Sequence, residues 1–385
     1  MAKLFMLNHR RKTHRILPTP DRSHEADKAL VAIIFVLVIL GLVCLSSVSS
    51  VAGYTKFDDA YHYFKSQLFG VTIGLVAFLF FAQTNYHIWK KYAFFFLISS
   101  VFLLILVFIP GVASEYGTSR SWIKIFGHSL QPSELVKLSF LLYLAGWIDA
   151  RKDELHDFYS GVGTFVAVLG FIGFLMLLQP DIGTLSIITA SSLIVYYVGG
   201  GSHKHVLSII IVGLLALAII IPRNEYQLNR IKCVMDPSFS ANDKCYQINQ
   251  SLIAVGSGGF FGRGLGQSRQ KFMYLPEVSG DSIFAIISEE TGMLFASILI
   301  MCYVFLFYRG YQVSKKAPDD FGKLLAIGIV SWIVIQAFIN IGGIINVIPM
   351  TGVPLPLVSH GGTAVLAALS ALGILVNISK HSKRE

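Results

Sequence analysis

Charged residues are scarce in this sequence. Of 385 residues, 14% are charged and 54% are hydrophobic, and the mean hydropathy is +0.65. A soluble protein of this composition would expose a largely apolar surface to water, whereas apolar surface carries no such penalty in lipid. The scarcity of charge therefore excludes an ordinary soluble domain and predicts an integral membrane protein. The net charge of +9 does not indicate a nucleic-acid partner, because the basic residues cluster beside the hydrophobic runs, as the positive-inside rule describes.

Several patterns are missing as well. The sequence has no Walker or Rossmann glycine pattern, no His or Cys at metal-like spacing, no low-complexity segment and no obvious internal repeat. Residues 1–28 carry seven Lys or Arg but no short apolar core followed by a small-residue cleavage site. We therefore predict a cytoplasmic N-terminal tail there instead of a signal peptide.

Cysteine is rare, with four residues in the chain. Cys44 and Cys302 fall inside apolar runs and are expected to be small core side chains. Cys233 and Cys245 lie in a long polar loop that the topology below places outside the cytoplasm, where disulfides persist. We hypothesise a disulfide between these two residues.

Hydrophobic runs of about 20 residues, the length of a membrane-spanning helix, recur along the chain. They predict an all-α, polytopic membrane protein with about ten transmembrane helices. The membrane domain covers residues 29–379, between the N-terminal tail and a short C-terminal tail at 380–385. The ten predicted spans are 29–51, 63–83, 93–110, 133–150, 161–178, 182–199, 206–222, 282–308, 324–347 and 362–379.

The distribution of Lys and Arg sets the predicted orientation. With both termini in the cytoplasm, the inner segments hold nineteen Lys or Arg and the outer segments hold ten in a larger number of residues. The large loop 223–280, between spans seven and eight, is then extracytoplasmic. The polar, irregular connections 111–132, 179–181 and 348–361 are also on the outer side, so we expect the function to face outward.

The start of the fourth predicted span concentrates polar residues, beginning with Gln131. Ser133 is suited to cap the helix, and Glu134 and Lys137 stand three residues apart on one helical face. Because charges are expensive inside a membrane, we expect this pair to line a wet cavity. The alternative is a structural ion pair at the helix entrance.

Four residues on other outer connections are further candidates for polar contacts. Arg120 offers a guanidinium for phosphate, and Trp122 offers a ring for a sugar or for the membrane interface. Asp181 opens a predicted helix, where the favoured interpretation is an ordinary capping Asp. Ser359, in the proline-rich segment 348–361, either contacts a substrate or caps the tenth span.

The stretch from Tyr246 to Gly292 is the most unusual part of the chain. Apolar residues at helical spacing (Ile248, Leu252 and Ile253) predict a short helix lying in the membrane interface. Six glycines between 256 and 266 then permit turns and close backbone approach. Positive charge beside these glycines suits either a pyrophosphate site or contact with anionic lipid headgroups, and it comes from Arg263, Arg269 and Lys271.

Carboxylates follow at the entrance of the eighth span. Asp281 precedes it, and Glu289 and Glu290 lie one to three turns deeper. A carboxylate that is partly desolvated and near other acids has its pKa raised toward the range of a general base. An Asp at the start of a helix is usually a cap. The neighbouring basic, glycine-rich loop makes a catalytic role for Asp281 a competing interpretation.

Four motifs together resemble one known family. The runs QPSELVKL, QPDIGT, YQINQSLIAVGSGGFFGRGLGQSRQKFMYLPE and PLPLVSHGGTA occur in this order within about residues 28–380. They are similar to those of the SEDS family of cell-wall glycosyltransferases, which includes RodA and FtsW. Within the family, GRGLGQSRQKFMYLPE looks more like the FtsW type, which acts in division, than the RodA type, which acts in elongation.

The resemblance implies polymerisation of lipid II into glycan strands on the outer face of the bacterial cytoplasmic membrane, at the division septum. It implies that Asp281 matches the family's essential aspartate and that Glu134 and Lys137 match its polar cavity residues. Arg or Lys side chains, or a divalent cation such as Mg²⁺ or Mn²⁺, would stabilise the pyrophosphate leaving group. The partners it implies are lipid II, the lipid-linked glycan strand, a class B penicillin-binding protein and other divisome proteins.

Two departures weaken the transfer of detail. The family usually has Asp-Phe-Ile-Phe where this chain has Asp-Ser-Ile-Phe from Asp281, and Ser-Tyr-Gly-Gly where this chain has Ser-His-Gly-Gly from Ser359. Competing functions are a lipid II flippase, a RodA-like elongation polymerase and a non-catalytic scaffold. A flippase should carry ionisable groups through the membrane depth, whereas here they gather at the outer face.

Overall fold

The computed structural model describes residues 25–109, 113–116, 119–125 and 128–382. It confirms a helical membrane-type fold, because a helix coincides with each predicted span. These helices are α1 (Lys28–Val48), α3 (His62–Gln83), α4 (His87–Leu106), α5 (Pro132–Ala150), α6 (Thr164–Leu178), α7 (Ile182–Val198), α8 (His203–Ile220), α11 (Ile283–Lys316), α12 (Asp320–Ile344) and α13 (Gly362–His381).

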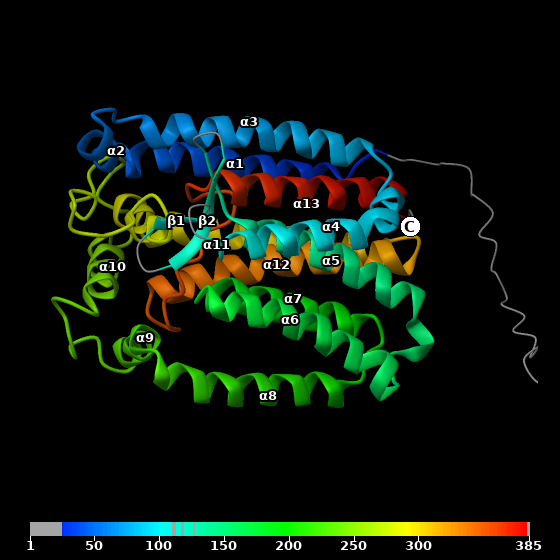
Figure 1. Ribbon diagram of the computed structural model, residues 1–385. Coiled ribbons are helices and arrows are strands. Elements are labelled where there is room, and N and C mark those ends of the chain that lie inside the picture. The colour runs from blue at the N-terminus through cyan, green and yellow to red at the C-terminus, as the bar shows by residue number, and fades with distance from the viewer. Residues whose placement is uncertain (1–24, 110–112, 117–118, 126–127, 383–385) are drawn as a thin grey trace, which may run out of the picture.

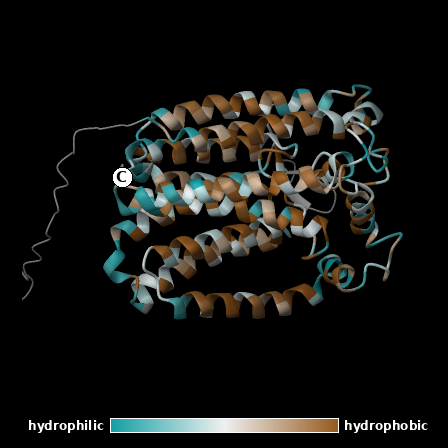
Figure 2. Cartoon of the chain, turned by 180° about the vertical axis from the view of Figure 1, so that it is seen from behind, coloured by the Kyte–Doolittle hydropathy of each residue, from teal (hydrophilic) through white to brown (hydrophobic). Residues whose placement is uncertain are grey.

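Eight helices in the described part of the chain are long and apolar enough to cross a membrane. Of the predicted spans, α7 has only 17 residues, and α5 carries three charged side chains within 19 residues. The count of ten spans and the inward orientation of both ends therefore stay predictions. Figure 2 shows hydrophobic residues along the helix middles and hydrophilic residues toward their ends, as a bilayer requires.

The helices run side by side, and the two described ends of the chain meet at one end of the bundle (Figure 1). There Asp27 N donates a hydrogen bond to Ser379 Oγ (3.2 Å). α12 and α13 form the centre, and most of their apolar residues are buried. α8 lies apart from the bundle, and none of its residues is buried.

A small antiparallel sheet is the exception to the all-α prediction. Strands β1 (Ala113–Tyr116), β2 (Ser119–Ile125) and β3 (His128–Leu130) occupy the connection 111–132, which the sequence presents only as polar and irregular. Trp122 pairs with Ser114 across β1 and β2. Strands this short carry too little alternation of polar and apolar residues to be recognised from the sequence.

The end of the bundle that is predicted to face outward, called the outer end below, holds several short helices. The predicted disulfide is confirmed: Cys233 and Cys245 are bonded, with 5.5 Å between their Cα atoms. It joins the end of α9 to the start of α10, the short helix predicted around Ile248. The short elements at this end are α2 (Ser50–Phe57), η3 (Ile221–Arg223), α9 (Glu225–Met235) and α10 (Tyr246–Ser257), whereas η1 (Lys152–Glu154) and η2 (Phe158–Gly163) connect α5 to α6 at the opposite end.

α11 is interrupted at Gly292, where φ is 76° and ψ is 179°. In an unbroken helix, the amides of residues 293 and 294 would donate to the carbonyls of residues 289 and 290. The glycine-rich loop 258–264, called the plug loop below, takes over all four groups. The bonds run from Arg263 N to Glu289 O (3.0 Å), from Gly264 N to Glu290 O (2.9 Å), from Met293 N to Gly259 O (2.9 Å) and from Leu294 N to Phe260 O (3.2 Å).

The contact between the plug loop and the helix break requires glycine on both sides. Gly292 and Gly262 both have positive φ, at 76° and 81°. A Cβ on Gly292 would lie 2.2 Å from Gly262 N, and one on Gly262 would lie 2.3 Å from Glu290 O. Part of the glycine cluster therefore serves to insert a loop backbone into a broken helix.

We expect Gly292→Ala to lower the free energy of unfolding by about 2 kcal/mol or more, because it adds a backbone clash to an unfavourable φ. The matched control is Gly170→Ala in α6, where a Cβ meets no atom within 4 Å. The measurement is the thermal unfolding midpoint of each purified variant in detergent. Equal midpoints for the two variants would contradict the structural role of Gly292.

Candidate functional site

Asp281 lies at the outer end of the bundle, two residues before α11 begins. Its Oδ1 lies 3.4 Å from Gln247 Nε2 of α10 and 3.4 Å from Ser282 Oγ. Its main-chain carbonyl accepts a hydrogen bond from Asn340 Nδ2 of α12 (2.7 Å). Two contacts thus reach Oδ1 and one holds the main chain, and among the described residues none of the hydrogen bonds goes to Oδ2.

The environment tunes this carboxyl group. Burial raises the pKa of Asp281 to about 6, while the Arg230 guanidinium pulls the pKa down and the Glu277 carboxylate pushes it up. At neutral pH most of the group is ionised, yet its proton affinity is well above that of an exposed Asp. These are the properties that a general base needs.

Arg230 of α9 is a cation that acts electrostatically on Asp281. A methyl group built on Gly352 would lie 3.8 Å from Asp281 Oδ2 and 4.0 Å from Arg230 Nη2, so carboxylate and guanidinium face the same space. The guanidinium also donates to Met350 O and to Tyr226 OH. The sequence analysis missed Arg230, because nothing in the local sequence distinguishes it from the other basic residues of the loop.

The segment 348–361 passes beside Asp281 and is pinned by side-chain amides. Asn340 Nδ2 donates to Val353 O (2.8 Å), and Gln336 Nε2 donates to Pro354 O (2.9 Å). Both amides come from α12, one helical turn apart. The same Asn340 nitrogen also holds Asp281, so α12 sets the position of the segment and of the carboxylate together.

Ser359 does not cap the tenth span, so that interpretation is wrong. The N-cap residue of α13 is Gly361, and the buried Ser359 hydroxyl accepts a hydrogen bond from Leu355 N (2.8 Å), closing a turn. His360 N donates to Ser279 O (2.8 Å), which ties the segment to the chain before Asp281. Burial lowers the pKa of His360 to about 4, so its ring is neutral at pH 7. Contact between Ser359 and a substrate stays a prediction.

The Glu134 and Lys137 pair is buried between α5 and α12. Lys137 Nζ lies 2.7 Å from Glu134 Oε1 and 2.7 Å from Gln336 Oε1, and its ammonium sits 5.1 Å from the centre of the Trp332 ring. Both side chains are at most 2% exposed. These contacts favour the structural alternative over a cavity-lining pair. Through Gln336, the pair supports the segment at Pro354.

The neighbouring candidates hold helix ends together. Ser133 is not the N-cap of α5 as predicted; Gln131 is the N-cap residue, because Pro132 already has helical geometry. Ser133 Oγ instead donates to Asp181 Oδ2 (3.3 Å), and Asp181 Oδ1 accepts from Thr184 N (3.0 Å). The capping interpretation of Asp181 is confirmed. Gln131 N donates to Thr363 Oγ1 (3.3 Å), which joins α5 to α13.

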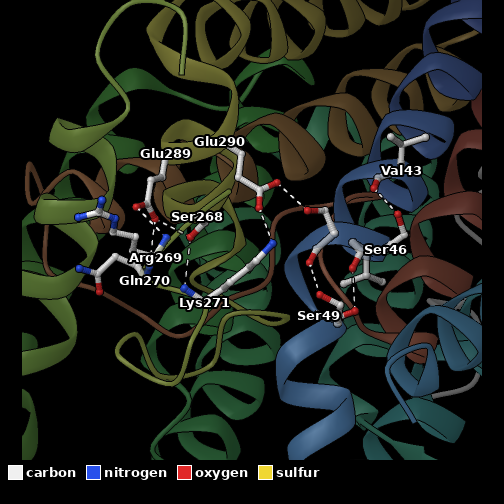
Figure 3. A network of polar contacts seen from close by, with 12 residues as sticks. Val43, Ser46, Ser49, Ser268, Arg269, Gln270, Lys271, Glu289 and Glu290 are labelled. Carbon is white, nitrogen blue, oxygen red and sulfur yellow. Dashed lines mark hydrogen bonds and ion pairs between the residues drawn. The ribbon is translucent and has the colours of Figure 1, made fainter. Parts of the chain in front are cut away.

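Figure 3 shows the hydrogen bonds and the ion pair made by Arg269 and Lys271, two basic candidates that follow the plug loop. Lys271 Nζ lies 2.9 Å from Glu290 Oε1, and both side chains are nearly fully buried. Glu290 Oε2 accepts a hydrogen bond from Ser47 Oγ at the outer end of α1 (2.7 Å). The charge of Lys271 is therefore neutralised inside the protein, which argues against direct contact with a substrate pyrophosphate.

Glu289 binds the residues that follow the plug loop, Ser268 to Gln270. Its carboxylate accepts hydrogen bonds from Ser268 Oγ (2.5 Å), Arg269 N (3.1 Å) and Gln270 N (3.2 Å). Arg263 Nε donates to Ser257 O (3.2 Å) and lies 3.8 Å from Glu289 Oε1. A phosphate-binding role for Arg263 and Arg269 stays a prediction.

The two remaining candidates lie on β2. Trp122 is half-buried there, and the side chain of Arg120 lies outside the described part of the structure. No group of three or more His, Cys, Asp or Glu side chains that could hold a metal occurs among the described residues. Mg²⁺ is often held by one or two carboxylates together with substrate phosphates. Asp281 fits that limited demand, and the divalent cation stays a prediction.

The chain is similar to known proteins along nearly its whole length. Residues 27–384 match the cell cycle protein family of FtsW, RodA and SpoVE. The stage V sporulation protein E of Bacillus subtilis (strain 168) is 38% identical over 94% of this chain and 99% of that protein. The probable peptidoglycan glycosyltransferase FtsW of Trichlorobacter lovleyi is 34% identical over 96% of this chain and 97% of that protein.

Solved structures share the fold. A chain of a peptidoglycan synthase complex aligns with a TM-score of 0.74 at 24% identity, over 92% of this chain and 97% of that chain. The rod shape determining protein RodA of Thermus thermophilus aligns with a TM-score of 0.68 at 24% identity, over 94% of this chain and 98% of that chain. The family match covers nearly the whole chain, and the family inferred from the four motifs is confirmed: this protein belongs to the FtsW, RodA and SpoVE family.

Proposed function

We propose that this protein is a peptidoglycan glycosyltransferase that polymerises lipid II into glycan strands on the outer face of the cytoplasmic membrane. Full-length relatives at 31–34% identity are named probable peptidoglycan glycosyltransferase FtsW, which supports the reaction class. The observation that carries the proposal is the placement of Asp281, with its raised pKa, opposite the Arg230 guanidinium.

In the proposed step, Asp281 removes the proton from a sugar hydroxyl of the acceptor. The hydroxyl oxygen attacks the anomeric carbon of the donor and forms the new glycosidic bond, while the bond from that carbon to the lipid pyrophosphate breaks. Negative charge develops on the departing pyrophosphate, and a guanidinium is suited to bind it through paired hydrogen bonds. We assign this role to Arg230, because it faces the same space as Asp281 Oδ2.

The surrounding amides act as positioning groups. The buried side chains of Asn340 and Gln336 together hold Asp281 and the segment from Val353 to Pro354. A misplacement of the base by about 1 Å can cost on the order of 100-fold in rate. The buried Glu134 and Lys137 pair contributes indirectly, because Lys137 orients Gln336.

The assembly and its cellular role are part of the same proposal. One structural neighbour comes from a peptidoglycan synthase complex that coordinates polymerization and crosslinking, which supports a crosslinking partner such as a class B penicillin-binding protein. Lipid II as the substrate, other divisome partners and a place at the division septum follow from the FtsW-like motif. The relatives named for rod shape and for sporulation indicate that family members serve other processes as well.

We expect Asp281→Asn to reduce glycan strand formation by at least about 100-fold, because the amide cannot accept the proton. The assay supplies purified protein with lipid II, with and without its class B partner. Asp236→Asn is the matched control, since Asp236 lies on the same loop 223–280, is exposed, and its carboxylate accepts hydrogen bonds from the nearby Ser238. Unchanged synthesis by Asp281→Asn would contradict the assignment of the base. No synthesis by the wild type with any partner would favour transport or scaffolding.

The pH dependence provides a second prediction. We expect kcat/KM to fall as the pH drops through about 6, because Asp281 becomes protonated. Arg230 lowers the pKa of Asp281, so Arg230→Gln should move the midpoint to higher pH; Glu277 raises it, so Glu277→Gln should move the midpoint to lower pH. The two pH midpoints should shift in opposite directions even if either variant also changes the maximal rate. Shifts in the same direction would contradict the proposed electrostatics.

A further inference from the structure

Large apolar side chains on the plug loop, and that of Leu265 directly after it, are exposed. Phe260 is 51% exposed, Phe261 is 78% exposed and Leu265 is 63% exposed. We call these three residues the apolar rim. Exposed apolar groups gathered on one loop usually mark a surface that contacts a membrane or another protein.

The rim is held rigidly from within, so its exposure is a fixed property of the fold. The plug loop makes four backbone hydrogen bonds with α11. The following residues are fastened by Glu289 and by the buried ion pair of Lys271 with Glu290 (Figure 3). Turning this loop so that its Phe side chains face inward would break its backbone hydrogen bonds with α11.

The position of the rim along α11 points to what covers it. From Ile283 to Glu290 the helix is buried, and its exposed face starts at Met293 and Leu294 and continues through Ile298 and Met301. The bonds from the amides of residues 293 and 294 to the plug loop place Phe260 directly against the start of that face. The rim is thus continuous with the surface that a membrane helix turns toward lipid.

Depth can be judged from helix length. About 20 residues at 1.5 Å each span the 30 Å hydrocarbon core, so a span that starts near Met293 ends close to the basic residues Lys315 and Lys316. On the outer side, Glu290 bonds to Ser47, one residue before the end of α1. Both measures put the rim at the outer boundary of the hydrocarbon.

We propose that the apolar rim is inserted in the outer leaflet of the membrane and anchors the loop that leads to Asp281. Phe260, Phe261 and Leu265 contact the upper acyl chains, and Arg263, between them in sequence, reaches the lipid phosphate level. A partner protein covering the rim is a separate possibility. Lipid is favoured because the rim continues the lipid-facing side of α11 without a break.

The test uses Phe261→Trp in the full chain, reconstituted without partners in phosphatidylcholine and phosphatidylglycerol vesicles. The added fluorescence relative to wild type is measured with lipids brominated at different acyl depths and with aqueous iodide. We expect lipids brominated near the headgroup to quench most of the added signal and iodide to have little effect. Thermal midpoints confirm that the variant is folded.

Phe239→Trp is the matched control. Phe239 is 50% exposed and lies in the connection between α9 and α10. Figure 1 shows this connection beyond the ends of α1 and α3. Its added signal should be quenched by iodide and not by brominated lipid. If Phe261→Trp behaves like this control, the rim faces water in the isolated protein, and the proposal is overturned in favour of a partner-protein surface.

Discussion

A backbone amide or carbonyl without a hydrogen-bond partner costs several kcal/mol in lipid, and α11 is broken at the edge of the lipid-exposed region. The site depends on how this break is satisfied. The break leaves four groups of two helical hydrogen bonds unpaired, and the plug loop pairs each of them with one of its own groups; Gly262 and Gly292 allow the two backbones to meet. The helical segment before the break, residues 283–291, is thereby locked against the loop. Asp281 lies two residues before this segment, so the repaired break helps to fix the position of the carboxylate.

A second set of buried polar groups fixes Asp281 from the opposite side. Asn340 and Gln336 lie one turn apart on α12, among mostly apolar buried residues. Each amide spans elements that are distant in sequence, and removal of either would leave buried backbone carbonyls without a donor. Such groups contribute more to a unique geometry than to net stability, because water would bond the same atoms in the unfolded chain. A catalytic carboxylate benefits from that geometry, since its rate depends on alignment with two substrates.

The membrane-spanning helices can be located from the sequence because a span needs an apolar run of about 20 residues. The Cys233 and Cys245 bond and the candidacy of Asp281 could also be predicted from composition and position. Arg230 could not, because its importance arises only where α9 folds back toward Gly352. The glycine-rich loop was interpreted as an anion site from its nearby positive charge. The sequence does not reveal that Glu289 and Glu290, on α11, bind Ser268 and Lys271 of the chain that follows the plug loop.

This redistribution of charge bears on the chemistry. Lys271 is paired with Glu290, Lys137 is paired with Glu134, and the ring of His360 is neutral. Unlike these three residues, Arg230 faces the space beside Asp281 Oδ2. The guanidinium then has two effects that oppose each other, since it would stabilise a departing pyrophosphate while it lowers the proton affinity of the base. Burial of Asp281 offsets the second effect and keeps the pKa near 6, so one arginine can serve the leaving group without disabling the base.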